Sequence, residues 1–194
     1  MGRKVIATKT AEATWAYQSD RALIVPHVGS SVTESFPEDF LVRLYLKMKQ
    51  DGSLRRMLPN VSQHSMANFI AYFYNKTMLI CVAKPGKIAG FVWIYDVEGN
   101  NKFKRASVGV CFFKEYWGNP VIYELGRLAL GWMFKELNLS MVLGTIASWN
   151  RASVRFGKAL GFEYCGTVPM FFLKEDSATA MDMVSLSKEK FYHG

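Results

Sequence analysis

The sequence predicts an α/β fold: a mixed, twisted sheet of about six or seven strands with flanking helices. The apolar run at residues 106–113 is short enough for a buried strand, and residues 120–137 then repeat apolar side chains at helical spacing. A second apolar run at residues 140–147 precedes another helix, which ends at residues 160–162. This strand–helix–strand–helix order is typical of parallel strands joined by a right-handed crossover, so we expect the two apolar runs to be neighbours in the sheet.

Further strand candidates lie on both sides of this unit. They are short segments rich in apolar or β-branched side chains, bounded by proline, glycine or polar clusters. The turn at Pro85-Gly86 joins two of them as a hairpin. The candidates are residues 13–17, 22–25, 78–82, 88–97, 164–173 and 181–186.

Two helices are predicted before that hairpin. Ser35 is a good N-cap and Pro37 suits a first turn. This first helix should end at Asp51-Gly52, because glycine commonly terminates helices. Ser62 begins the second helix, whose apolar side chains recur at helical spacing up to Phe73.

Length and composition place the chain among globular proteins. It has 194 residues, of which 50% are hydrophobic and 14% aromatic, so we expect one domain spanning residues 1–194. No apolar run is long enough to cross a bilayer, and the segment after Met1 lacks the apolar core of a signal peptide. Cys81, Cys111 and Cys165 lie in apolar runs without the paired spacing of a zinc site, as expected of buried thiols in a reducing compartment. We therefore expect a cytoplasmic protein with no membrane partner and no metal.

The net charge of +8 suits an anionic partner. The basic residues are scattered, however, and form neither a long stripe nor a nucleic-acid motif. We expect a mildly basic, solvated surface rather than nucleic-acid binding. A polyanionic cofactor or an acidic partner is also consistent with this charge.

The turn that follows residues 106–113 is the place to look for chemistry. Gly118 lets the backbone approach a ligand closely, and Pro120 suits a first helical turn, where its missing N–H loses no intrahelical bond. The N-terminus of the next helix offers unpaired N–H groups and a partial positive charge, which together bind phosphate. An ordinary strand-to-helix turn has the same features, so the residues alone leave both interpretations open.

Two motifs in this region resemble the GNAT superfamily of acetyl-CoA-dependent N-acetyltransferases, and most closely the branch that includes the ribosomal-protein N-terminal acetyltransferases. That branch shows, roughly, E-I-G-Y-W-L-x-P-E-Y-W-G-K-G-Y-A-T-E-A and later N-x-x-S-x-R-V-L-E-K-L-G-F. The chain matches the first motif at Ser107-Val108-Gly109, Glu115-Tyr116-Trp117-Gly118-Asn119-Pro120 and Glu124-Leu125, and the second at Asn150, Ser153, Arg155, Phe156 and Leu160-Gly161-Phe162. The resemblance covers about residues 76–175 and implies that the two parallel strands splay apart.

The resemblance implies that acetyl-CoA is the co-substrate and that its pantetheine arm lies in the split between the parallel strands. A backbone N–H within residues 110–112 would face the thioester oxygen. Asparagine and serine also favour helix starts, so helix capping alone is an alternative explanation for Asn150 and Ser153. The implied cofactor residues are Cys111, Phe112 and Phe113 beside the arm, Trp117, Gly118, Asn119, Val121, Ile122 and Tyr123 around the pyrophosphate, and Asn150 and Ser153 on the far side.

The resemblance also places the amine acceptor against the two predicted helices. The residues available there are Tyr45, His64, Tyr72 and Tyr74. The candidate catalytic residues are Ser107, Glu115 and Tyr164, with His64 as a further candidate base.

The chain departs from the family's pattern at positions that matter for chemistry. Pro120 replaces a second glycine and removes an N–H donor, and the bulky Tyr123 replaces a small residue. Ser107 stands where a carboxylate base is common, and Gly157 where a tyrosine acid is common. Two functions therefore remain open. One is an N-acetyltransferase acting on a protein N-terminus or a small-molecule amine. The other is a GNAT-fold protein without catalysis, serving as a structural or interaction module in a homodimer or a larger assembly.

Overall fold

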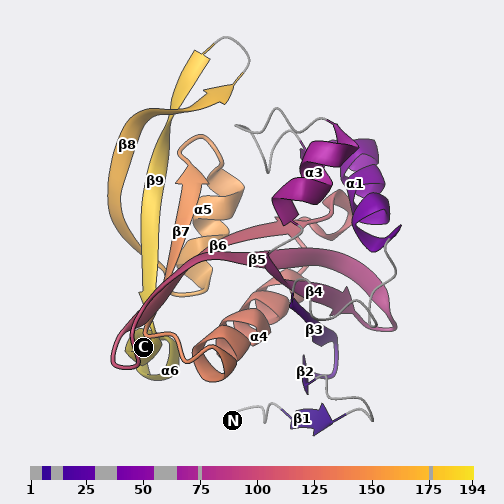
Figure 1. Ribbon diagram of the computed structural model, residues 1–194, viewed down its shortest axis with the longest axis vertical. Coiled ribbons are helices and arrows are strands. Elements are labelled where there is room, and N and C mark those ends of the chain that lie inside the picture. The colour runs from indigo at the N-terminus through magenta and orange to yellow at the C-terminus, as the bar shows by residue number, and fades with distance from the viewer. Residues whose placement is uncertain (1–5, 10–14, 29–38, 55–64, 74–75, 175–176) are drawn as a thin grey trace.

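The strands of the chain join in one mixed sheet in the computed structural model, which describes residues 6–9, 15–28, 39–54, 65–73, 76–174 and 177–194. Within these residues the sheet has nine strands in the order β1-β2-β3-β4-β5-β6-β7-β9-β8 (Figure 1). The predicted mixed α/β fold is confirmed. The strands are β1 Ile6–Lys9, β2 Trp15–Gln18, β3 Ala22–Val28, β4 Thr77–Ala83, β5 Lys87–Gly99, β6 Lys104–Phe112, β7 Met141–Ala147, β8 Glu163–Lys174 and β9 Ser177–Ser187.

The predicted parallel pair of strands is present. β6 pairs with β7 in parallel from Arg105 to Val108, which lies opposite Gly144. Helix α4 (Val121–Glu136) makes the crossover between them, and the other neighbouring strands run antiparallel. Both strands continue beyond Val108 and Gly144 without pairing further with each other. The predicted splay is therefore confirmed.

The sheet has more strands than the six or seven predicted, because the N-terminal region pairs more extensively than its sequence indicates. β1 is a segment of 4 residues, IATK, without a clear strand pattern, and its extended form is fixed by antiparallel pairing with β2. Several sequence predictions fall outside the described residues. They concern Ser35, Pro37, Ser62, His64 and Tyr74.

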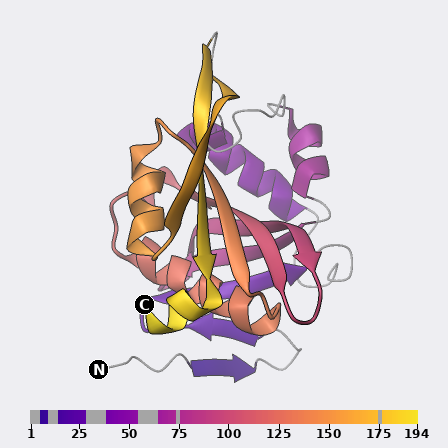
Figure 2. The same ribbon diagram turned by 90° about the vertical axis from the view of Figure 1, so that its left-hand side faces the viewer.

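Helices cover both faces of the sheet (Figures 1 and 2). α1 (Asp39–Asp51) and α3 (Met66–Phe73) lie on one face, and α4 and α5 (Arg151–Ala159) lie on the other. A short helix, α6 (Lys188–His193), ends the chain. α1 stops at the predicted residue, since Gly52 follows it with a φ of +74° that glycine adopts readily. None of the described helices is long and apolar enough to cross a membrane.

Two hydrophobic cores form between these layers, and β5 separates them. Successive side chains of a strand point to opposite faces. Phe91 and Trp93 accordingly pack with α1 and α3, in what we call the α1–α3 core. Val92 and Ile94 pack with α4, in the α4 core. The apolar side of α4 predicted from its helical spacing is the side that is buried.

The cysteines differ in their surroundings. Cys81 and Cys111 are buried, as predicted, whereas Cys165 is exposed, so its prediction was wrong. Cys165 lies on β8, which is the last strand in the sheet order and therefore an edge strand. An apolar run in the sequence does not distinguish such an edge strand from a buried one.

Candidate functional site

The split between β6 and β7 exposes backbone donors inside the sheet. The N–H of Phe113, directly after β6, donates to the carbonyl of Ala89 on the β5 side at 2.9 Å. Because alternate residues of a strand direct their N–H groups to opposite sides, Val110 and Phe112 direct theirs towards β7. The parallel pairing has already ended at Val108, so no described strand lies opposite these two groups. Of the range 110–112 in which a thioester donor is predicted, Val110 and Phe112 have the required direction.

A cavity of about 520 Å³ opens at this split. Its lining comes from both faces of the sheet, from α3 and β5 on one face and from α4 and α5 on the other. Several small residues are among those that line it: Gly109, Gly126, Ala129, Gly144 and Gly157. Gly157 is the position at which a tyrosine acid is common in the family.

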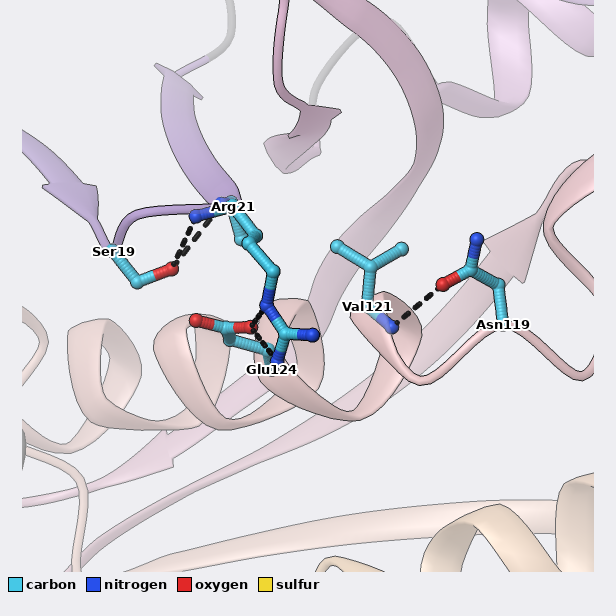
Figure 3. Close-up of polar contacts among 6 residues, drawn as sticks. Ser19, Arg21, Asn119, Val121 and Glu124 are labelled. Atoms are coloured by element: carbon cyan, nitrogen blue, oxygen red, sulfur yellow. Dashed lines mark hydrogen bonds and ion pairs between the residues drawn. The ribbon is translucent and has the colours of Figure 1, made fainter.

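The predicted phosphate turn is closed by hydrogen bonds within the chain. Gly118 has a φ of +80° and open space around it, so the backbone is accessible there. The N–H of Val121 donates to Oδ1 of Asn119 at 3.0 Å (Figure 3), and the N–H of Asn119 donates to the carbonyl of Tyr116 at 3.0 Å. The N–H of Tyr123 donates to the carbonyl of Pro120 at 3.1 Å. A phosphate in this turn would have to exchange some of these bonds for its own.

An ion pair unforeseen from the sequence lies beside the start of α4 (Figure 3). Arg21, in the turn between β2 and β3, contacts the Glu124 carboxylate at 2.9 Å. The hydroxyl of Ser19 accepts hydrogen bonds from the N–H groups of Arg21 and Ala22 and orders that turn. The guanidinium offsets the negative charge of Glu124 in the first turn of α4. No local pattern relates Arg21 to Glu124, because they are 103 residues apart.

An aromatic stack joins the end of β6 to both helices of the α4 face. The ring of Phe156 on α5 lies 5.5 Å from the ring of Phe112 and 5.5 Å from that of Tyr123. Phe112 and Tyr123 are both predicted cofactor residues, and Phe156 brings them together. Trp117, another predicted residue, donates its indole N–H to the Phe112 carbonyl at 2.8 Å. The stack and this bond fix the end of β6 against the start of α4.

Other predicted cofactor residues present only backbone to the split. Cys111 and Phe113 direct their side chains into the α1–α3 core, and Val121 and Ile122 are buried in the α4 core. Burial raises the pKa of the Cys111 thiol to about 12, the neighbouring Ser53 hydroxyl opposes that rise, and the charge of Asp51 adds to it. The thiol is therefore protonated and is not a nucleophile.

Asn150 and Ser153 lie together at the start of α5. Oδ1 of Asn150 accepts a hydrogen bond from the N–H of Ser153 at 3.2 Å, so Asn150 is the N-cap of α5. Both residues also line the cavity. Capping is thus established, and contact with a bound cofactor remains a prediction.

The three candidate catalytic residues lie in different places. Ser107 lines the cavity. Glu115 is on the surface and pairs with Lys47 at 2.8 Å, and Tyr164 is 62% exposed on β8 with its hydroxyl 2.6 Å from that of Thr167. Of these three, only Ser107 is brought to the cavity by the described part of the chain.

Two of the residues predicted for the acceptor wall lie in the described part of the chain. Tyr72 lines the cavity, whereas Tyr45 is buried in the α1–α3 core. Trp93, Tyr95 and Asp96 of β5, which were not predicted, also line the cavity on this face. The sequence contained one signal for this placement. Trp93 and Tyr95 are two residues apart on one predicted strand, so their side chains point to the same face of the sheet. Among the described residues there is no group of three or more histidine, cysteine or acidic side chains arranged to hold a metal.

Solved structures share this fold. A ribosomal-protein-S5-alanine acetyltransferase from Vibrio fischeri has a TM-score of 0.67 at 17% identity, covering 91% of this chain and 98% of its own. A GNAT-family acetyltransferase from Bacillus anthracis has a TM-score of 0.66 at 13% identity, covering 90% and 99%. Spermidine N-acetyltransferase from Vibrio cholerae, solved with CoA and spermine, has a TM-score of 0.70 at 13% identity, covering 88% and 98%. At such low sequence identities, these comparisons show that the chain has the same fold as these proteins and nothing more specific.

Sequence comparison assigns the family. A search of curated protein sequences found no match. Residues 36–163, however, match the family described as "Acetyltransferase (GNAT) domain". That span contains the parallel strands, the crossover helix and both motifs on which the resemblance was based. The splayed strands, the cavity between them and this match agree, and the chain belongs to the GNAT family of acetyltransferases.

Proposed function

We propose that the chain transfers an acetyl group from acetyl-CoA to an amine, and that it prefers α-amines or other amines of low pKa to lysine side chains. The observation that carries the proposal is the split itself, in which the N–H groups of Val110 and Phe112 point away from β5 and Val110 lines a cavity of about 520 Å³. Acetyl-CoA is the acetyl donor of this family, and it supplies the acetyl group as a reactive thioester. The identity of the acceptor is the finer part of the proposal.

Positioning and backbone donors would carry out most of the catalysis. The amine forms a bond to the thioester carbon, the carbon–sulfur bond breaks, the amine loses a proton to solvent, and the thiolate gains one. An N–H from Val110 or Phe112 would stabilise the negative charge that develops on the carbonyl oxygen. Holding both reactants in the cavity removes much of the entropic barrier. Ser107, the candidate that lines the cavity, is too weak a base to deprotonate an ammonium ion.

The preference for α-amines follows from this shortage of a base. A lysine side chain has an ordinary pKa of about 10.4, so only about one in 2,500 is neutral at pH 7. An α-amine has a pKa of about 7.7–8.0, so roughly a tenth or more is neutral. General base catalysis typically supplies about a hundred-fold, which a lysine acceptor would need to recover.

A paired-peptide assay tests this proposal. One peptide has a free N-terminus and no lysine, and the other has a blocked N-terminus and a single lysine. We expect the first to be acetylated at least about ten-fold faster at pH 7. Release of the coenzyme A thiol measures the rate, and a peptide with a blocked N-terminus and no lysine gives the background. Faster turnover of the blocked lysine peptide would mean that an effective base is present.

The second function left open by the sequence also has an observation in its favour. The N–H groups of Asn119, Val121 and Tyr123 are already bonded within the chain, and Pro120 has none to offer. A non-catalytic GNAT-fold module would need no free donors in this turn. Failure of both peptides to react, together with no binding of acetyl-CoA in a calorimeter, would favour that function over the enzyme.

A further inference from the structure

The cavity has an aromatic face that the transfer of acetyl does not require. On the side of α1 and α3 it is lined by Tyr72 from α3 and by Trp93, Tyr95 and Asp96 from β5. Tyr95 lies opposite Ser107 and Trp93 lies opposite Gly109 in the pairing of β5 with β6. These aromatic side chains therefore stand directly beside the strand that forms one wall of the split.

A primary ammonium group already lies over this aromatic face. Nζ of Lys76 is 4.4 Å from the ring centroid of Tyr72 and 5.9 Å from that of Tyr95. An ammonium ion within about 6 Å of an aromatic ring is attracted by the negative charge on the ring face. An alkyl ammonium of the chain itself therefore lies against the rings of these two tyrosines.

The two tyrosines remain neutral phenols, as this attraction needs. Burial raises the pKa of Tyr72 above its ordinary value, an interaction with the Trp93 indole opposes the rise, and the charges of Tyr95 and Asp96 add to it. Burial also raises the pKa of Tyr95, a hydrogen bond with Thr145 opposes the rise, and the Asp96 charge adds to it. Both hydroxyls therefore stay protonated at neutral pH and into the alkaline range.

Asp96 adds a carboxylate to this aromatic face. It lies where the pairing of β5 with β6 becomes irregular, between Tyr95 and Glu98, and it has a φ of +49°. Aspartate and asparagine adopt this left-handed region more readily than other residues that carry a side chain. Asp96 is exposed, lines the cavity and forms no ion pair with a described residue. Its charge is therefore available to a cation that enters.

The Trp93 indole lies between this aromatic face and β6. A side-chain carbon added at Gly109 would lie 2.0 Å from the Trp93 ring, so the indole extends across β6 at that glycine. Trp93 is 5% exposed, and its indole N–H has no hydrogen-bond acceptor among the described residues. Ser107, opposite Tyr95, is three residues from Val110, which corresponds to roughly 10 Å along the strand.

We propose that Tyr72, Tyr95 and Asp96 bind an ammonium group that does not react, so that the preferred acceptors carry a second cation roughly 10 Å from the amine that is acetylated. This rests on the proposed function for the reacting amine. The second cation belongs either to a small aliphatic diamine or to a basic side chain close to a peptide's free N-terminus. Lys76 occupies the same site in the free protein and is displaced by the acceptor.

Matched acceptors test this second-cation site. Heptane-1,7-diamine and heptylamine have the same chain length and differ in the second ammonium. Two peptides that differ only in arginine or glutamine near the free N-terminus provide the same comparison for a peptide source. We expect kcat/KM to be about ten-fold higher for the dicationic member of at least one pair, because a cation held by two rings and a carboxylate gains this much. The pair whose two members differ in kcat/KM shows whether the second cation belongs to a small diamine or to a peptide side chain.

Variants test whether these residues cause the preference for dicationic acceptors. Asp96→Asn, whose new side chain also tolerates the left-handed backbone, should reduce the ratio of kcat/KM between the two members to within about three-fold. Lys76→Met keeps the chain length without the charge and should raise the ratio, because it removes the internal competitor. Glu98→Gln is the matched control: Glu98 is an exposed acid on the same strand, paired with Arg105, and does not line the cavity. The ratio should stay at the wild-type value in this control.

A binding measurement keeps this inference separate from the proposed function. Calorimetric titration of the protein with each amine, without acetyl-CoA, reports the second-cation site alone. Tighter binding of heptane-1,7-diamine, together with no acetylation of either peptide with a free N-terminus, would retain the site and refute the acetyltransferase. Turnover with equal kcat/KM for both members of each pair, in the wild type and in Lys76→Met, would overturn the site and retain the enzyme.

Discussion

Replacing Gly118 by glutamate is expected to weaken the binding of acetyl-CoA about a hundred-fold. No atom lies within 4 Å of a side-chain carbon added at Gly118, so the new side chain displaces no neighbour. Its carboxylate would stand where the pyrophosphate is proposed to bind. Two like unit charges about 6 Å apart repel by roughly 3 kcal/mol at an effective dielectric constant of about 20, and each 1.4 kcal/mol is about ten-fold in affinity. Isothermal titration calorimetry measures the change.

Gly118→Gln is the matched control for this charge effect. Glutamine has nearly the same size as glutamate and imposes the same backbone strain at a φ of +80°, but it carries no charge. The affinity difference between the two variants therefore isolates electrostatic repulsion. If Gly118→Glu and Gly118→Gln bound acetyl-CoA equally well, the pyrophosphate could not lie over this turn.

Replacing Gly109 by alanine is expected to lower the melting temperature by roughly 5–10 °C. The added carbon would lie 2.0 Å from Cζ2 of Trp93. The indole cannot swing aside, because the rings of Phe73 and Phe91 pack against it with centroids 5.5 and 5.6 Å away. Overpacking of this kind costs about 1–3 kcal/mol, and each kcal/mol shifts the melting temperature of a chain of this size by about 2–4 °C. Differential scanning calorimetry gives the shift.

Two further variants show whether the contact with Trp93 causes the lower melting temperature of Gly109→Ala. Gly131→Ala, in the middle of α4 with no atom within 4 Å of the new carbon, should be stabilising by up to about 1 kcal/mol through helix propensity. In a Trp93→Leu background, Gly109→Ala should lose most of its effect, because the clashing ring atoms are gone. An unchanged penalty in that background would point to the backbone of Gly109 rather than to its contact with Trp93.

The sequence predicted those parts of the fold that depend on local pattern. The parallel strands and α4 were placed within one or two residues, because apolar spacing and the turn around Gly118 are encoded in adjacent residues. The capping of α5 by Asn150 follows from the preference of asparagine for that position. The family motifs identified the split for the same reason, since each motif is continuous in the chain.

Contacts between distant segments could not be predicted in this way. The pairing of Arg21 with Glu124 and the position of Phe156 between Phe112 and Tyr123 depend on how three elements meet. The irregular pairing of β5 that puts Asp96 on the cavity wall is likewise a property of two strands, not one. The sequence therefore predicted the split between β6 and β7 better than it predicted the other residues that line the cavity.

The divergence of β6 from β7 also has a consequence for exchange of backbone hydrogen with deuterium in solvent. The N–H groups of Gly109 and Cys111 point towards β5, whereas those of Val110 and Phe112 point into the split. We expect an alternating pattern along one strand, with Val110 and Phe112 labelled well before Gly109 and Cys111. A ligand that bonds to the open side should slow Val110 and Phe112 selectively, which reports occupancy of the split without any acetyl transfer.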